Sequence, residues 1–329
     1  MIEFIVLILG VLLYKVYQFI LPPASIPAER RAVLISGCDT GFGYNLACSL
    51  YTRNYTIYAG CLTDNAVQQL QHKLPSAHVF KLDITKQSDI DNAVELVNQY
   101  SGGVLYGLVN NAGIGLNGLI DWIDITQYYN TFNVNFFGHV AMTKSFIPLL
   151  IKQQHSRVIN ICSVAGFLGA PNLSAYCCSK FALEAFSDSL RREMSVYDMH
   201  VSIIEPGYMK TPILDGVNPA NQQSKQLWSS LSSDKKNVWG ESYYSELVSK
   251  GAGIAKYAED AMLVDTALIN AISSKYPSHR YRVGLFCNIL FFPLATYAPT
   301  FITDWLIRII DGSTIPKFIT DGKQNIVES

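Results

Sequence analysis

Charged residues are scarce in this chain, and neither sign is in excess. Asp, Glu, Lys and Arg make up 16% of the 329 residues, below the quarter that is usual in soluble domains. The 25 Lys and Arg against 26 Asp and Glu leave a formal net charge of −1. Nucleic-acid binding needs a basic excess to displace counterions, so we expect no nucleic-acid partner. The 49% of hydrophobic residues excludes a disordered chain and suggests contact with a membrane.

A disulfide or zinc pattern is also missing. Seven cysteines, an odd number, are irregularly spaced and stand at positions 38, 48, 61, 162, 177, 178 and 287. Paired CxxC motifs do not occur, and most of the cysteines lie inside apolar runs. We therefore expect reduced, structural thiols, and we predict no metal site.

One long apolar run opens the chain. Residues 2–21 read IEFIVLILGVLLYKVYQFIL, which is long enough to cross a bilayer as a helix. A signal peptide is the alternative, but the run lacks a basic start and a small-x-small cleavage site. We predict an uncleaved anchor over residues 1–21 and a proline-stiffened linker over residues 22–30.

The orientation of this anchor follows from the nearby basic residues. Lys15, Arg30 and Arg31 lie toward or beyond its C-terminal end, so the positive-inside rule favours a cytosolic main domain. A glycosylation sequon at Asn172 falls in the expected catalytic region, where a glycan would block the site. A second sequon, at Asn54, keeps the lumenal alternative open.

A second apolar stretch, at residues 285–310, is interrupted by Pro293 and Pro299. We expect two short pieces that cover the core or lie on a bilayer surface, with a membrane-spanning helix as the alternative. Residues 286–329 are therefore treated as an apolar C-terminal extension and tail.

Between the two apolar ends, short β-branched runs alternate with helical patterns. Six strands are expected, at 32–36, 55–60, 78–82, 104–110, 157–162 and 200–206. Helices are expected near 42–53, 64–73, 88–99, 126–153 and 175–197, with Asp64 and Ser88 as N-caps. This alternation predicts an α/β fold, a doubly wound, Rossmann-like parallel sheet with helices on both faces, over residues 31–285. The polar, Ser-rich segment 212–250 interrupts it and is predicted to be a substrate loop.

A glycine-rich turn follows the first expected strand directly. Gly37, Gly41, Phe42 and Gly43 belong to the run SGCDTGFG, which opens the next helix. Glycines let the backbone approach a pyrophosphate closely, and the helix N-terminus supplies amide donors. Asp39 in this turn would repel a ribose 2′-phosphate, so NAD is favoured over NADP. The alternative is that Asp39 closes an Asx turn.

Three residues further along form a catalytic pattern. Ser163 ends an expected strand, Tyr176 follows thirteen positions later, and Lys180 lies four beyond Tyr176. The i, i+4 spacing places the ammonium beside the phenol, where it lowers a pKa that is otherwise too high for a base. Asn135 lies in a long apolar helix, either as a buried residue satisfied by backbone or as a holder of a relay water.

These motifs together resemble the short-chain dehydrogenase/reductase family over roughly residues 31–285. The resemblance implies that Asn135, Ser163, Tyr176 and Lys180 form a catalytic tetrad. It also implies that the cofactor contacts, besides the glycine turn, Tyr176 and Lys180, are Asp83, Ile84, Asn110, Ala112, Gly113, Pro206, Gly207 and Thr211. Tyr176 would take the hydroxyl proton while Lys180 binds the nicotinamide ribose.

Longer stretches of the sequence, such as SVAGFLGAPNLSAYCCSKFALEAF, are similar to the membrane-bound retinol and hydroxysteroid dehydrogenase branch of this family. This implies an NAD-dependent dehydrogenase of a lipophilic alcohol, held in the membrane of the endoplasmic reticulum, with a possible homodimer. A hydroxyacid dehydrogenase of the D-3-hydroxybutyrate type is the alternative. Its carboxylate would need a cation, and Lys210, Lys225, Lys235 and Lys236 do not exclude one, although we expect Lys210 to face solvent. A non-enzymatic interaction protein is disfavoured because all four tetrad positions are present.

Overall fold

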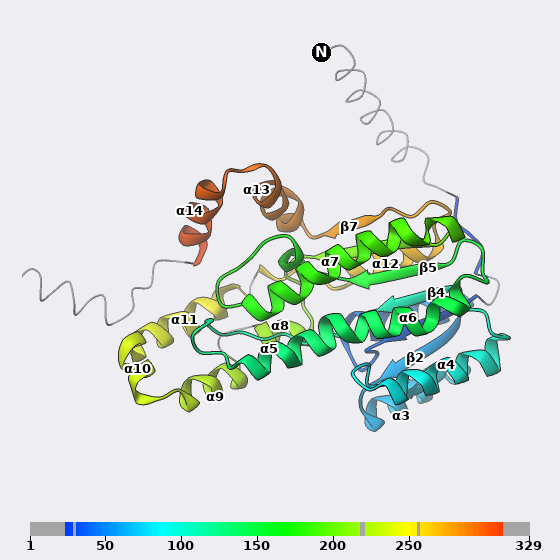
Figure 1. Cartoon of the computed structure of the whole chain (residues 1–329), viewed down its shortest axis with the longest axis horizontal. Helices are drawn as coiled ribbons and strands as arrows, with labels where there is room; N and C mark the ends of the chain where they lie inside the picture. The colour runs from blue at the N-terminus through cyan, green and yellow to red at the C-terminus, as the bar shows by residue number, and fades with distance from the viewer. Residues whose placement is uncertain (1–23, 29–30, 218–220, 255–256, 312–329) are drawn as a thin grey trace, which may run out of the picture.

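A parallel sheet of seven strands forms the centre of the molecule, in the order β3-β2-β1-β4-β5-β6-β7 (Figure 1). The computed structural model describes residues 24–28, 31–217, 221–254 and 257–311. The strands are β1 (Ala32–Ser36), β2 (Thr56–Cys61), β3 (His78–Lys81), β4 (Gly107–Asn110), β5 (Arg157–Ile161), β6 (His200–Pro206) and β7 (Arg280–Val283). β1 pairs with both β2 and β4, so the strand order reverses there and opens a crevice at the carboxyl ends.

Helices cover both faces of the sheet, which confirms the predicted doubly wound α/β fold. They are α2 (Gly41–Tyr51), α3 (Asp64–Lys73), α4 (Gln87–Ser101), α5 (Ile125–Phe132), the π-helix η1 (Asn133–Gly138), α6 (His139–Leu150), the 3-10 turn η2 (Val164–Gly166), α7 (Ser174–Met194), the 3-10 turn η3 (Ser195–Tyr197) and α12 (Met262–Ser273). Apolar residues of α4, α6 and α7 pack on one face, and those of α2, α3 and α12 pack on the other.

All six expected strands are present, and the sequence pattern missed one strand and two caps. The missed strand, β7, reads RYRV, and two arginines at a partly exposed sheet edge give no apolar run. The predicted caps are wrong: Thr63 caps α3 by accepting from the Ala66 amide, and α4 begins at Gln87, before Ser88. Thr63 has an extended backbone, as an N-cap requires, whereas Asp64 is already helical.

The segment between β6 and α12 is helical. It contains α8 (Pro212–Val217), α9 (Gln222–Ser230), α10 (Ser233–Trp239) and α11 (Glu241–Ile254). The Asn and Ser residues that suggest a loop act as caps here: Asn221 accepts from the Ser224 amide, and Ser232 accepts from the Lys235 amide. α9, α10 and α11 project beyond the sheet in Figure 1, and their role as a substrate element stays a prediction.

An aromatic cluster attaches these helices to the main domain. Its members are Trp122, Trp228, Trp239, Tyr243 and Tyr244. Trp122 lies in the loop before α5, and its ring centroid is 5.1 Å from that of Trp228 on α9. Trp228 in turn stacks on Tyr244 of α11 at 4.9 Å. Apolar ring contacts therefore hold α9–α11 in place, although their sequence is mostly polar.

The C-terminal apolar stretch forms short helices, in line with its two prolines. The π-helix η5 (Cys287–Phe291) leads into α13 (Phe292–Tyr297), and α14 (Thr300–Asp311) begins directly after Pro299. Within the part of the chain that the structure describes, no helix combines the length and the apolar character that a membrane span requires. The predicted anchor at residues 1–21 lies outside the described residues.

Candidate active site

The glycine turn after β1 has a shape that only glycine permits at two positions. Gly37 has a φ of +69°, and a Cβ there would lie 2.7 Å from the Ala112 Cα. A Cβ on Gly43 would lie 2.5 Å from the Gly37 carbonyl oxygen. The first turn of α2 therefore packs directly on the turn that precedes it, as a close-fitting phosphate loop requires.

Asn111 fixes this turn to the end of β4. Its Nδ2 donates to the Ser36 and Gly37 carbonyl oxygens, both at 2.9 Å. In return, Ser36 Oγ accepts from the Asn111 and Ala112 amides at 3.1 and 3.2 Å. At the start of α2, Thr40 makes no capping hydrogen bond with its side chain. The amides of this helix end are thus left for an anion from outside.

Asp39 reaches the end of β2 from the glycine turn. Its carboxylate accepts from the Leu62 amide at 2.8 Å and from the Thr63 amide and hydroxyl at 3.0 Å. The end of the second strand is where Rossmann folds place an acid toward a ribose, and β2 itself offers none there. Asp39 therefore places a carboxylate at the end of β2 from a neighbouring loop.

One cavity of about 690 Å³ lies at the carboxyl ends of the strands. The predicted site residues that line it are Gly37, Asp39, Gly41, Phe42, Asp83, Ile84, Ala112, Gly113, Ser163, Tyr176, Lys180, Pro206, Gly207 and Thr211. Gly43, Asn110 and Asn135 do not line it. Gly43 belongs to the packing just described, and the Asn110 side chain donates to Thr143 and Asn160 inside the domain.

Ser163, Tyr176 and Lys180 meet in this cavity. Ser163 caps η2, with its Oγ accepting from the Ala165 amide at 3.1 Å. Lys180 Nζ lies 5.7 Å from the centre of the Tyr176 ring, one turn away on α7, and donates to the Ile161 carbonyl at 2.8 Å. The predicted placement of ammonium beside phenol is confirmed.

The charge state of the pair is set mainly by burial. Burial raises the pKa of Tyr176, and a hydrogen bond with Ser163 acts in the opposite direction. Burial also lowers the pKa of Lys180. We expect the ammonium, together with the positive charge of a nicotinamide, to lower the pKa of the phenol; in the chain alone, burial is the main influence and raises this pKa. Burial therefore favours the protonated phenol of Tyr176 in the chain alone.

Asn135 and His139 support the backbone at residues 112–114. Asn135 lies in η1, where Nδ2 donates to the Ile114 carbonyl at 3.0 Å and Oδ1 accepts from the Ile114 amide at 2.9 Å. Nδ2 also donates to Ser179 Oγ at 3.2 Å, which joins η1 to α7. Its role in a proton relay stays a prediction.

His139, which no sequence motif indicates, lies with its Nε2 at 2.7 Å from the Ala112 carbonyl oxygen. Burial lowers the pKa of His139 to about 3. The neutral ring therefore donates to this carbonyl and fixes the segment that borders both the glycine turn and the catalytic residues.

The rest of the cavity lining is mostly apolar and includes Leu168, Leu173, Tyr208, Met209, Ile213 and Phe291, with Gln223 of α9 among the polar residues. Phe291 comes from η5, so the C-terminal extension reaches the cavity. Lys180 is the one cation among the described lining residues. Lys210 is exposed, as expected, and Lys235 pairs with Asp121 at 3.2 Å.

The reversed strand order, the glycine turn and the α7 residues define a Rossmann-type α/β protein. More narrowly, the chain belongs to the short chain dehydrogenase family, whose model matches residues 31–222. It is 35% identical to "Retinol dehydrogenase 5" of Mus musculus over 92% of this chain and 96% of that protein. It is also 36% identical to "17-beta-hydroxysteroid dehydrogenase type 6" of Bos taurus, over 85% of this chain and 88% of that one.

Among solved structures, a short-chain dehydrogenase from Streptomyces avermitilis shares the fold, with a TM-score of 0.68 and 23% identity. The alignment covers 87% of this chain and 98% of that one. Together, the family and its relatives make the chain an alcohol-type oxidoreductase.

Proposed function

We propose that this chain is an NAD-dependent dehydrogenase of a lipophilic alcohol of the retinoid or hydroxysteroid type. The observation that carries the proposal is a single cavity with a glycine turn at one end, an apolar lining at the other and Ser163, Tyr176 and Lys180 between them. The relatives named for retinol and 17β-hydroxysteroid support the substrate class.

The residues present fit a nicotinamide dinucleotide. The uncapped N-terminus of α2 and the close-packed turn at Gly37 would hold the pyrophosphate. The Asp39 carboxylate would accept from a free ribose 2′-hydroxyl and would repel a 2′-phosphate, which favours NAD over NADP. When bound, this cofactor supplies the hydride acceptor or donor at the substrate carbon.

The chain's own contribution is to move a proton and orient an oxygen. In alcohol oxidation, the hydroxyl proton would pass to the phenolate oxygen of Tyr176, while the carbon that bears the hydroxyl would give up a hydride to the bound cofactor. In carbonyl reduction, Tyr176 returns the proton to the oxygen. The Ser163 hydroxyl would hold that oxygen beside the phenol, and Lys180 would position the ribose and stabilise the phenolate.

A small hydroxyacid is the less suitable substrate. Its carboxylate would need a cation in the cavity, and the one described lining cation, Lys180, already donates to the Ile161 carbonyl. The apolar lining instead offers area for a hydrocarbon skeleton.

Membrane attachment is part of the same proposal. Residues 2–21 would anchor the chain in the membrane of the endoplasmic reticulum, with the catalytic domain facing the cytosol. Phe301, Trp305 and Ile309 of α14 recur every four residues and are 72%, 60% and 58% exposed, as expected for an apolar face resting on lipid. A homodimer stays a prediction.

The test is a substrate comparison on membranes that carry the protein. Retinol, 3- and 17-hydroxysteroids and D-3-hydroxybutyrate would each be supplied with NAD or NADP, and the reduced cofactor measured. We expect selective turnover of a retinoid or steroid with NAD. Selective turnover of hydroxybutyrate would overturn the substrate class, and a preference for NADP would overturn the role of Asp39.

A further inference from the structure

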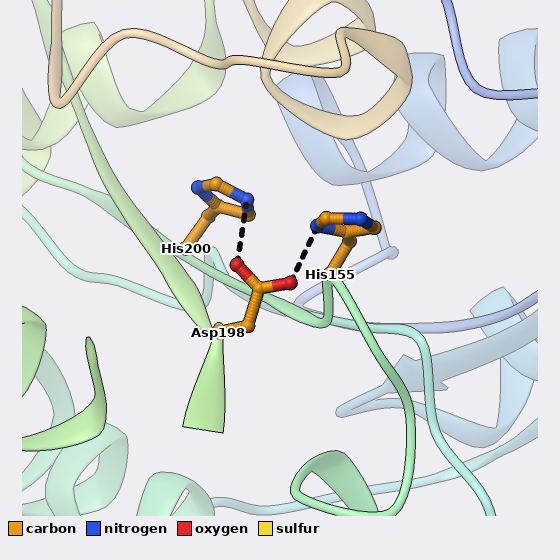
Figure 2. Close-up of side chains that lie close together, drawn as sticks. All are labelled: His155, Asp198 and His200. Atoms are coloured by element: carbon orange, nitrogen blue, oxygen red, sulfur yellow. Dashed lines mark ion pairs between the residues drawn. The ribbon is translucent and has the colours of Figure 1, made fainter. Parts of the chain in front are cut away.

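Two histidines and an aspartate meet at the end of the sheet opposite the active site (Figure 2). His155 precedes β5, Asp198 follows η3, and His200 is the first residue of β6. His155 Nδ1 lies 2.7 Å from Asp198 Oδ2, and His200 Nε2 lies 4.0 Å from Asp198 Oδ1. The ligand atoms of all three residues lie within 4.8 Å of one another.

The two ring nitrogens that face the aspartate lie at ion-pair distance from it, as the dashed lines in Figure 2 mark, without forming a hydrogen bond. Both His155 Nδ1 and His200 Nε2 are shielded from solvent, and neither has a hydrogen-bond partner of acceptable geometry. The two rings are nearly parallel, with centroids 5.9 Å apart, and Asp198 lies between them in Figure 2. Three electron-pair donors therefore converge on one small volume.

We propose that His155, Asp198 and His200 bind a divalent transition-metal ion of the zinc type. Imidazole nitrogen and carboxylate oxygen are ligands that zinc prefers, at about 2.0–2.2 Å, so that tetrahedral ligands lie about 3.3 Å apart. His155 Nδ1 lies 2.7 Å from Oδ2 and His200 Nε2 lies 4.0 Å from Oδ1, on either side of this value, so binding the ion would require side-chain rotation until one Asp198 oxygen faces both nitrogens. A fourth position stays open to water.

The backbone holds two of the ligands in a restricted conformation. His155 and Asp198 have φ values of +54° and +55°, in the left-handed region that few non-glycine residues occupy. The His200 amide donates to the Ser156 carbonyl at 2.8 Å, which fixes the starts of β5 and β6 to each other. A bound ion would join the two chain segments that enter these neighbouring strands.

Arg157 limits the affinity. Its guanidinium is buried two residues from His155 and donates to Tyr106 and to the Ile272 and Ser274 carbonyls. This positive charge opposes a cation, while the Asp198 carboxylate attracts one. We therefore expect binding weaker than that of a closed four-ligand zinc site, and an effect on stability rather than on turnover, because the active site lies at the other end of β5.

The test uses the full chain in detergent, stripped with a chelator, in a Cys178→Ser background that removes the exposed thiol. We expect Zn²⁺ titrated by calorimetry to bind at one ion per chain and to raise Tm by about 5 °C at saturation. X-ray absorption of the zinc should show nitrogen and oxygen neighbours with no sulfur.

Three variants separate ligand loss from damage to the fold. Asn tolerates the left-handed region, so His155→Asn and Asp198→Asn keep the backbone, and His200→Gln completes the set. Each should weaken Zn²⁺ binding about tenfold or more. As a control, His72→Asn, at an exposed position of α3, should leave Zn²⁺ binding unchanged. The proposal would be overturned if the three variants kept the metal-free Tm of the parent and bound zinc as tightly as the parent does. Sulfur neighbours in the X-ray absorption spectrum, or no saturable zinc binding by the parent, would also overturn it.

Discussion

The two ends of the cavity are built by different means. At the glycine turn, backbone contacts set the shape: Gly37 lies against Ala112, and Asn111 holds two consecutive carbonyls. At the apolar end, side chains from distant segments set it, including Phe291 of the C-terminal extension. The helices near that end are attached by the aromatic cluster.

Because of this difference, we expect the two ends of the cavity to tolerate substitutions to different degrees. A backbone-built turn binds one common group and tolerates little change, since an added Cβ meets main-chain atoms. An end built from apolar side chains changes its shape with each substitution. Changes at the glycine turn should therefore act on cofactor binding, and changes in the aromatic cluster should act on substrate binding.

Tyr176, between the two ends, should show the largest effect. Tyr176→Phe removes the proton carrier while leaving the buried ring, so kcat should fall about 10³-fold or more, with the Kd for NAD nearly unchanged. Steady-state assays and cofactor titration measure both quantities. Tyr257→Phe, at a 66% exposed position, is the matched control. Full turnover by Tyr176→Phe would rule out the proposed mechanism.

Gly37→Ala should break the glycine turn. The new Cβ would lie 2.7 Å from a main-chain atom at a φ of +69°, a strain of about 2 kcal/mol. We expect NAD binding to weaken about thirtyfold and Tm to fall. Gly169→Ala, where a Cβ meets nothing within 4 Å, should change neither quantity. Equal NAD affinity and equal Tm in the two variants would show that the close approach of Gly37 to Ala112 is not needed for cofactor binding.

Asp39→Ser should alter cofactor choice without breaking the turn. Removing the carboxylate removes the repulsion of a 2′-phosphate, and the ratio of kcat/KM with NADP to that with NAD should rise about tenfold. Asp64→Ser, at an exposed position just beyond β2, serves as the charge control. An unchanged ratio in Asp39→Ser would show that cofactor choice is made elsewhere.

Trp228→Leu should give the smallest effect on turnover. It removes the stack on Tyr244 and the hydrogen bond to Glu241 at 2.9 Å, which loosens α9–α11. The KM for a lipophilic alcohol should rise about fivefold while the Kd for NAD stays constant. A change in the Kd for NAD of the same size would remove the distinction between the two ends.

The sequence predicts the glycine turn well because its chemistry is local. Gly37, Gly41 and Asp39 lie within five positions, and Tyr176 and Lys180 lie one helical turn apart, so spacing alone brings them together. Asn111 supports the turn by donating to a carbonyl 74 positions earlier, and His139 contacts the Ala112 carbonyl 27 positions earlier. Such contacts exist only once the sheet has formed.

The apolar end of the cavity is harder to predict from the sequence, because it too depends on contacts between distant segments. Phe291 lines the cavity because η5 lies against β6, where Cys287 donates to the Glu205 carbonyl; the apolar run at 285–310 suggests that this stretch covers the core but not which residue reaches the cavity. Asn221 and Ser232 suggest a loop by composition, yet they cap helices. His155, Asp198 and His200 likewise have no metal-ligand spacing in the sequence and meet only because β5 and β6 are neighbours.

The transfer of deuterium from a labelled alcohol to the cofactor would show whether this chain moves a hydride from a lipophilic alcohol to NAD. Retinol with both hydrogens of its carbinol carbon replaced by deuterium, or a hydroxysteroid with deuterium on its carbinol carbon, would be incubated with the protein and NAD, and the cofactor analysed by mass spectrometry. We expect singly deuterated NADH in a one-to-one ratio with the carbonyl product, formed about 10³-fold more slowly by Tyr176→Phe. Carbonyl product without deuterium in the cofactor, or bound NAD with no transfer from any lipophilic alcohol, would contradict it.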